Sequence, residues 1–377
     1  MGLLAPPERG DAVTHGPPDH KGLLGEAWPN QVLTENFAVL YTPTVDPAVA
    51  ERTANLLEEA WTALVEEQGW KAPPRSEAFL VRVELDPSIS WTGYTSMVAG
   101  DGGDYPLIQL HPGTSSSPPF YASLVAHEFA HALQFGYRPA YNATPDEPWY
   151  WEASAEWSAE LALPDIDAYA HQVVFYADRP ELRYASTQDS HAYGMSVLNA
   201  ALLERLDVDL LTVWELGEEN PGRAWDAVIA DAAGLPAGAV WGEFTGAMGN
   251  NLLAESELYA DVVEHPLEVG ASSQLEYLGT HYYRASEAST VLVVGEVMLG
   301  GPDGFGERIE LQADDVLSVT GLDADVAVYQ LQGDVVREPK GCVGCGGGQA
   351  MWLGLLSPIL LATRRSTRRR RSGCSSR

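Results

Sequence analysis

The sequence Leu124-Val125-Ala126-His127-Glu128-Phe129-Ala130-His131-Ala132-Leu133-Gln134 contains two histidines four positions apart, and a glutamate directly follows the first of them. In an α-helix, residues four apart lie on the same face, with their Cβ atoms about 5–6 Å apart. Both imidazoles can therefore bind one metal ion. Glu128 lies one position further round the helix, where its carboxylate can reach a water next to that ion. We expect this helix to carry the functional site.

The pattern H-E-x-x-H is the signature of the helix that binds zinc in metallopeptidases. The alternative is a solvated helix with two surface histidines. The neighbouring residues argue against that alternative, because apolar side chains surround the helix on nearly all sides, as in a buried helix. These residues are Tyr121, Leu124, Val125, Phe129, Ala130, Ala132, Leu133 and Phe135. Buried histidines beside a carboxylate need polar partners, and a metal ion supplies one.

A catalytic zinc ion needs a third protein ligand and an open coordination position. A second helix is predicted over residues 149–160, with Pro148 near its first turn. Glu152, Glu156 and Glu160 recur every four residues and therefore lie on one face. Their mutual repulsion disfavours the helix unless a cation or another partner compensates it. The third ligand is therefore expected on this face, whereas Glu160 is expected to be solvated.

With these two helices the chain resembles the gluzincins, the thermolysin-like metallopeptidases whose third zinc ligand is a glutamate on the helix after the H-E-x-x-H helix. The 21 positions from His131 to Glu152 suit that family. The resemblance implies that His127, His131 and Glu152 bind Zn²⁺. Glu128 is then the general base, and Glu156 orients one of the two histidines by accepting its second ring N–H. An exchange of roles between Glu152 and Glu156 stays open.

Hydrolysis through a tetrahedral intermediate also needs a donor for the oxyanion. Residues 190–196 lead into a helix predicted over Val197–Leu206, and they contain His191 and Tyr193. In gluzincins a tyrosine or a histidine from the downstream helical region is this donor, and the Tyr-Gly pair here resembles that of bacterial secreted metallopeptidases. We favour Tyr193 over His191. The alternative for Tyr193 is an aromatic side chain that only packs at the start of a helix.

The alternation of strand and helix patterns predicts an α+β fold, with a mixed N-terminal sheet, zinc-binding helices in a helical lobe, and a small C-terminal β-sandwich-like module. Strands are expected at residues 36–41, 78–85 and 106–111, and a helix at 47–67. The gluzincin resemblance implies that the strand at 106–111 is the edge strand before the zinc helix. Such a strand pairs with the backbone of a peptide substrate.

Composition divides the chain into four segments, because a Pro/Gly-rich start gives way to helical patterns and then to a β-rich texture after residue 258. Later helices are expected at 210–216, 224–233 and 239–253, and later strands at 282–284, 291–294, 308–311 and 326–329. The predicted segments are an irregular leader or pro-segment at 1–34, a metallopeptidase domain at 35–258 (sheet lobe 35–115, helical lobe 116–258), a β-module at 259–340 and a tail at 341–377.

The 377 residues include 53 acidic and 22 basic ones, which gives a formal net charge of −31. All of the acidic residues precede position 342, whereas seven arginines follow it. Residues 1–341 are therefore strongly acidic and repel the phosphate backbone of nucleic acids. We exclude nucleic acid as a partner on this ground. The acidic loops at 101–104 and 323–325 lack the spacing of known Ca²⁺ loops and are expected to be solvated.

The tail combines Cys342 and Cys345 among glycines, an apolar run at 350–362 and six arginines at 364–371. The apolar run is shorter than the roughly 20 residues of a stable membrane span. This order resembles the MYXO-CTERM sorting tail of myxobacterial surface proteins, which implies membrane retention, processing by a sorting protease near the cysteines, and surface display. A C-x-x-C redox or zinc pair is the alternative, but no second pair exists in the chain.

Arginines that follow an apolar run stay in the cytoplasm, so the enzyme body is expected outside it. Residues 1–25 contain no apolar core of signal-peptide length. Either the start of the chain is misassigned, or a leader has been removed, or the export interpretation is wrong; we favour a missing or misassigned leader. Residues 1–341 contain no cysteine, so disulfides do not stabilise the body.

Together these patterns predict an extracytoplasmic zinc metallopeptidase that acts on peptide or protein substrates. Two alternatives stay open: a surface adhesin or binding protein with a degenerate peptidase body, and a zinc hydrolase that does not act on peptides. The presence of Glu128 counts against the adhesin, because a scaffold that only binds metal does not need a general base between its ligands.

Overall fold

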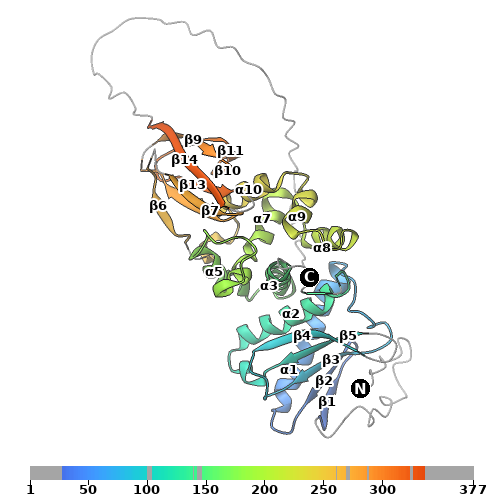
Figure 1. Ribbon diagram of the computed structural model, residues 1–377. Coiled ribbons are helices and arrows are strands. Elements are labelled where there is room, and N and C mark those ends of the chain that lie inside the picture. The colour runs from blue at the N-terminus through green and yellow to red at the C-terminus, as the bar shows by residue number, and fades with distance from the viewer. Residues whose placement is uncertain are drawn as a thin grey trace, which may run out of the picture. The chain divides into compact units, whose positions relative to one another are not determined.

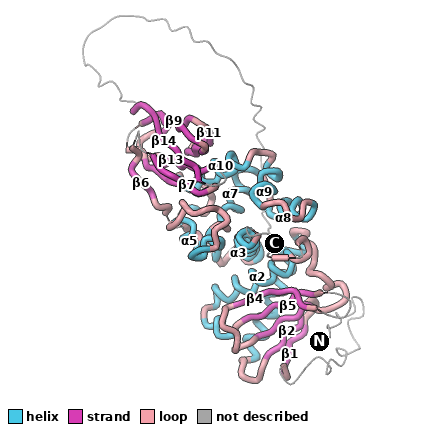
Figure 2. The backbone as a smooth tube through the Cα atoms, viewed as in Figure 1, coloured by secondary structure: helices cyan, strands magenta, loops and turns pink. Residues whose placement is uncertain are grey.

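The computed structural model describes residues 28–99, 104–138, 140–141, 147–259, 261–268, 272–286, 288–322 and 326–335. The predicted α+β fold is confirmed: along the chain, one mixed sheet is followed by a series of helices and then by two further sheets (Figures 1 and 2). Within these residues no helix combines the length and the apolar character needed to cross a membrane. The tail at 341–377 and the two acidic loops, except for Asp104, lie outside the described residues.

The first sheet has the strand order β1-β2-β3-β5-β4. Its strands are β1 (Asn30–Leu33), β2 (Phe37–Tyr41), β3 (Val81–Leu85), β4 (Gly93–Val98) and β5 (Tyr105–Leu110). The central strands β2, β3 and β5 run parallel, and the outer strands β1 and β4 pair antiparallel with their neighbours. The central strands β2 and β3 are buried along their whole length, which accounts for the continuous apolar sequence of β2.

Two sequence predictions about this sheet are wrong. Residues 30–33, which were expected to be irregular, form β1 because their backbone completes the ladder beside β2. The strand before the helix that carries His127, β5, is not the edge strand, because β4 pairs with its outer side. The edge strand is β4, which the sequence analysis did not predict.

Two helices cover one face of this sheet (Figure 1). Helix α1 (Pro47–Trp61) continues into the π-helical turn η2 (Thr62–Glu67), and α2 (Pro118–Gln134) follows the 3-10 turn η3 (Pro112–Ser116). The Phe37 ring of β2 has its centroid 5.8 Å from that of Trp61 on α1 and 5.3 Å from that of Phe129 on α2. Both helices therefore pack against the same side of β2.

The helical part begins with α3, which packs along α2. Its elements are α3 (Pro148–Ala162), α4 (Ala168–Gln172), α5 (Val174–Ala177), η4 (Gln188–Ser190), α6 (His191–Gly194), α7 (Val197–Leu206), α8 (Leu210–Glu219), α9 (Trp225–Ala233), α10 (Ala237–Gly249) and η5 (Ser256–Leu258). Trp149, Tyr150 and Trp151 in the first turns of α3 are completely buried. This burial fixes the rotation of α3 about its axis and so the direction of its glutamates.

Two further sheets form the C-terminal β-module. One has the order β11-β10-β13-β8-β6 and the other β12-β9-β14-β7. The strands are β6 (Glu264–Pro266), β7 (Ser272–Glu276), β8 (Thr280–Arg284), β9 (Ser289–Gly295), β10 (Val297–Gly301), β11 (Gly304–Gly306), β12 (Arg308–Leu311), β13 (Val316–Gly321) and β14 (Val326–Val335). One apolar cluster lies between these two sheets, as in a sandwich. It includes Leu299 on β10 and Leu317 on β13 from one sheet, and Val291 on β9 and Leu331 on β14 from the other.

The β-module is joined to helix α10 by buried polar contacts. Thr245 and Ser318 share a hydrogen bond of 2.8 Å between their hydroxyl oxygens. The Asn250 side chain, at the end of α10, donates to the Val316 carbonyl at 2.7 Å and accepts from the Val316 N–H at 2.8 Å. The module therefore shares an interface with the helical part of the chain.

Candidate metal centre

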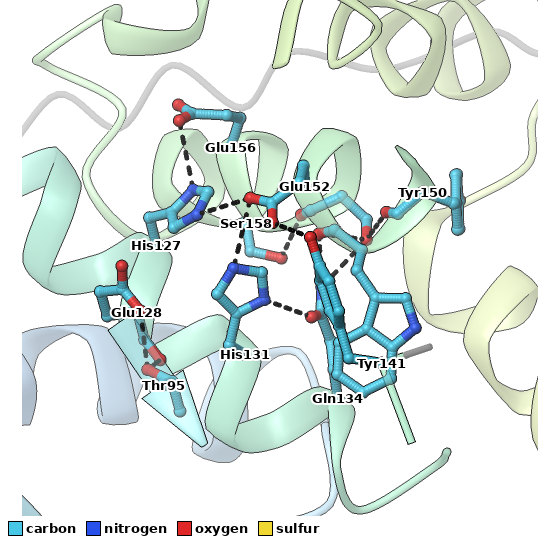
Figure 3. Close-up of polar contacts among 12 residues, drawn as sticks. Thr95, His127, Glu128, His131, Gln134, Tyr141, Tyr150, Glu152, Glu156 and Ser158 are labelled. Atoms are coloured by element: carbon cyan, nitrogen blue, oxygen red, sulfur yellow. Dashed lines mark hydrogen bonds and ion pairs between the residues drawn. The ribbon is translucent and has the colours of Figure 1, made fainter. Parts of the chain in front are cut away.

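Two histidines of α2 and a glutamate of α3 converge on one point. The Glu152 Oε2 atom lies 3.3 Å from His127 Nε2 and 3.5 Å from His131 Nε2, as Figure 3 shows. His127 and His131 are 5% and 7% exposed. One nitrogen of each imidazole and one carboxylate oxygen lie within 4.8 Å of one another. The structure therefore brings together the three residues that the sequence assigned as metal ligands.

The other ring nitrogen of each histidine faces a polar side chain. His131 Nδ1 lies 2.7 Å from Gln134 Oε1, and the Gln134 amide donates in turn to the Trp151 carbonyl and to Ser154 Oγ, each at 3.0 Å. His127 Nδ1 lies 3.2 Å from Glu156 Oε1, at ion-pair distance but without the alignment of a hydrogen bond. Partners of Nδ1 favour the tautomer with a free Nε2 lone pair. Both Nε2 atoms face Glu152.

The carboxylates of α3 create a negative electrostatic field at the two histidines. Burial lowers the pKa of His127, but Glu156 and Glu152 outweigh burial and hold that pKa well above its ordinary value. Burial raises the pKa of Glu152, yet His131 and His127 hold it well below its ordinary value. The field at His127 therefore favours a positive charge there, either a proton on its ring or a metal ion beside it.

The distances separate these two possibilities. A proton on Nε2 would form a charge-assisted hydrogen bond to the carboxylate, for which N···O is about 2.7–2.9 Å. Ligands of tetrahedral zinc lie about 2.0–2.1 Å from the ion, which places them about 3.3–3.4 Å from one another. The observed 3.3 and 3.5 Å match the edges of a tetrahedron. Two imidazoles and one carboxylate are also a donor set that zinc uses in catalytic sites. The residues present thus fit a metal ion, and zinc is one that they suit.

Glu128 lies beside this group and is held by the edge strand β4. Thr95 Oγ1 donates to Glu128 Oε2 at 2.7 Å and lies 2.9 Å from the Glu128 carbonyl oxygen. A Cβ atom on Gly93 would come within 2.6 Å of Glu128 Oε1, so only glycine lets the strand pass this close. Glu128 is 4% exposed, and burial raises its pKa above the ordinary value, while His131 and His127 act in the opposite direction.

The two candidate oxyanion donors lie in different surroundings. The Tyr193 ring stacks on His127 with its centroid 5.9 Å away, and its pKa is raised by burial and then by Glu152 and Glu156. His191 is 1% exposed and packs against Tyr176 at 5.7 Å. The charged groups that affect the pKa of His191 are Glu181, Arg179 and Glu276, none of which belongs to the metal centre. The structure therefore places Tyr193 at the candidate metal centre and His191 in the buried core.

Besides Thr95, two polar residues of the site were missed in the sequence. The Tyr141 hydroxyl donates to Glu152 Oε1 at 2.5 Å, which leaves Oε2 for the histidines. Gln134 fixes His131, as described above. Gln134 could have been found, because it lies three residues after His131 on the same helix. Tyr141 lies in the loop between α2 and α3, where no periodic pattern points to a partner.

Glu160 was expected on a solvated face, and that expectation is wrong. Glu160 is only 6% exposed, because other elements cover α3 on nearly all sides. The surrounding helices and the segment near η5 therefore bury a glutamate that the spacing alone could not distinguish from a surface residue.

No protein-family model and no curated protein matches this chain.

Proposed function

We propose that the protein is a zinc-dependent peptidase of gluzincin type that hydrolyses peptide bonds in peptide or protein substrates. The observation that carries the proposal is the position of Glu152 Oε2, at tetrahedral-edge distances from two imidazole nitrogens and next to Glu128. His127, His131 and Glu152 are the proposed ligands. The chemistry that Zn²⁺ supplies in such a donor set is polarisation of a carbonyl and acidification of a water.

The residues around the ligands have the chemistry that hydrolysis requires. Glu128 accepts a proton from the attacking water and passes it to the leaving amine. Thr95 holds Glu128 Oε2, so Oε1 is the oxygen that meets the water. The Tyr193 hydroxyl donates a hydrogen bond to the oxyanion of the tetrahedral intermediate. Glu156 and Gln134 keep the imidazoles in the binding tautomer, and each acts through a ring nitrogen that does not face Glu152.

The edge strand β4 is the surface along which an extended peptide would bind. On its outer side β4 has no partner strand among the described residues, so its backbone groups can pair with a substrate. Trp91 and Tyr94, beside and within β4, are 49% and 53% exposed, with ring centroids 5.8 Å apart. Because β4 also holds Glu128, a peptide added to this edge would run past the general base. These aromatic side chains would contact apolar substrate side chains.

The tail extends the proposal to the place of action. Cys342, Cys345, the apolar run and the arginines support retention at the membrane, processing by a sorting protease, and an enzyme body outside the cytoplasm. This part of the proposal rests on the sequence alone.

The test is metal analysis of the purified full-length chain combined with digestion of casein and a peptide library. We expect about one zinc per chain, loss of hydrolysis with a zinc chelator, and recovery when Zn²⁺ is restored. His127→Ala should lose both zinc and activity. The matched control is His111→Ala, because His111 only accepts a hydrogen bond from the Gly113 N–H at the start of η3. Stoichiometric zinc without any peptide hydrolysis would favour the non-peptidase hydrolase instead.

A further inference from the structure

A second group of carboxylates lies away from the zinc ligands. Glu160 on α3, Asp167 before α4 and Glu255 before η5 each bring a carboxylate oxygen within 4.8 Å of the others. Glu160 follows Glu152 by eight residues, which is about 12 Å along the helix axis. The three residues come from segments that are far apart in the sequence, so the fold itself assembles them.

Glu160 is the buried member of this group. It is 6% exposed, and its Oε2 atom is buried without a hydrogen-bond partner. A buried carboxylate oxygen that lacks a partner is costly, because burial removes the water that would otherwise solvate it. Asp167 and Glu255 are only partly buried, which leaves a side of the group open to solvent. A ligand could enter from that side.

The surroundings do not neutralise these charges. Within the part of the chain that the structure describes, no arginine, lysine or histidine forms an ion pair with any of the three carboxylates. Glu255 Oε2 accepts a hydrogen bond from the Tyr169 hydroxyl at 2.6 Å, and phenols carry no positive charge. Burial, Glu255 and Asp167 together raise the pKa of Glu160 to about 8. The fold therefore holds three acidic groups together with no cation of its own.

We propose that Glu160, Asp167 and Glu255 bind a Ca²⁺ ion. The donor set consists only of carboxylate oxygens, which suit hard cations and not zinc or copper. Calcium–oxygen distances are about 2.3–2.6 Å, so two oxygens on opposite sides of the ion are at most about 5 Å apart, in keeping with the separation in this group. Mg²⁺ binds through one or two carboxylates and keeps several waters, which fits three converging carboxylates less well. Waters from the open side would complete the coordination.

This site would connect the end of α3, the turn before α4 and the segment before η5. Because α3 also carries Glu152 and Glu156, Ca²⁺ would stabilise the helix that supplies the metal centre without touching its ligands. The predicted effect is on stability, and it is independent of whether the protein hydrolyses peptides.

The test is thermal unfolding and calorimetric titration of the full-length, zinc-loaded protein after Ca²⁺ has been removed by dialysis against Ca²⁺-free buffer that contains Zn²⁺. Adding CaCl₂ alone should show one binding event per chain and raise the unfolding temperature by a few degrees. Glu160→Gln keeps the shape of the side chain but removes a charge, and should weaken Ca²⁺ binding at least about tenfold. Asp167→Asn is a second variant, at a partly exposed position where folding is not at risk.

The matched control is Asp165→Asn, two residues from Asp167 in an exposed part of the same turn, which should keep the wild-type response to Ca²⁺. The proposal is overturned if the wild-type protein neither binds Ca²⁺ nor gains stability from it. It is also overturned if both Glu160→Gln and Asp167→Asn respond to Ca²⁺ as the wild type does.

Discussion

At the scale of single residues, each proposed ligand of the candidate metal centre has a polar partner next to it. Glu152 is held by Tyr141, His131 by Gln134 and His127 by Glu156. Glu152 faces both Nε2 atoms and Glu156 faces only His127 Nδ1, and these positions favour Glu152 as the ligand and Glu156 as the residue that orients His127. Loss of a ligand and loss of an orienting partner should therefore have different consequences.

Metal affinity measures that difference. Glu152→Ala should abolish zinc retention, because only two ligands remain. Glu156→Ala and Tyr141→Phe should keep the site but weaken zinc affinity about 10–100-fold, as expected for residues that act through a ligand. Competition with a chromophoric chelator gives the three affinities. If Glu156→Ala lost all zinc while Glu152→Ala retained it, the roles assigned here would have to be exchanged.

At the scale of elements, the approach of β4 to α2 controls the position of Glu128. Gly93→Ala would place a methyl group 2.6 Å from the present position of Glu128 Oε1, and the carboxylate would have to move. Displacement of a catalytic group by about 1 Å can cost about 100-fold in rate. We expect peptide hydrolysis to fall at least tenfold with zinc content unchanged. Gly306→Ala is the control, because its nearest neighbours are 3.7 Å from the added Cβ; equal rates in the two variants would contradict the role of β4.

Helix α6 gives a prediction about pH. Burial lowers the pKa of His191 to about 4, below the ordinary value of 6.5. The unfolded chain then binds more protons than the folded chain between these pH values, so this contribution to stability is present above pH 6.5 and is lost as pH falls toward 4. The difference amounts to about 3 kcal/mol. Denaturant unfolding of the wild type and His191→Gln across this range should show a smaller acid-induced loss in the variant. Parallel curves would refute the assignment.

Elements with a local sequence pattern were predicted, whereas a strand that depends on pairing and a contact that depends on a loop were missed. Helix α2 was predicted from the H-E-x-x-H pattern among apolar residues, and α3 from Pro148 and the regular spacing of its glutamates. The shared face of His127 and His131 follows from α2. Strand β4 was missed because Gly93 and Ser96 interrupt its β pattern, and it is a strand only through its pairing with β5. Tyr141 was missed because its contact with Glu152 depends on the path of a loop.

At the scale of the whole molecule, the proposed zinc ligands, general base and oxyanion donor all lie between residues 127 and 193, far in sequence from the tail. Deleting residues 342–377 should therefore leave peptide hydrolysis unchanged and convert a membrane-associated protein into a freely secreted one, because the apolar run and the arginines are removed. Fractionation of cells that express both forms behind a functional leader makes the comparison. The same soluble distribution for both forms would show that the tail is no anchor, and loss of activity on truncation would place part of the enzyme in the tail.

The central claim is that a metal-activated hydrolysis depends on Glu128, and one comparison tests it most directly. Zinc-loaded wild type and zinc-loaded Glu128→Gln should be assayed side by side on the peptide library, with zinc measured in the same samples. Glutamine keeps the shape of the side chain but cannot accept the proton, so the account predicts equal zinc content of about one per chain and a rate at least about 100-fold lower in the variant. Hydrolysis at the wild-type rate by Glu128→Gln would contradict it.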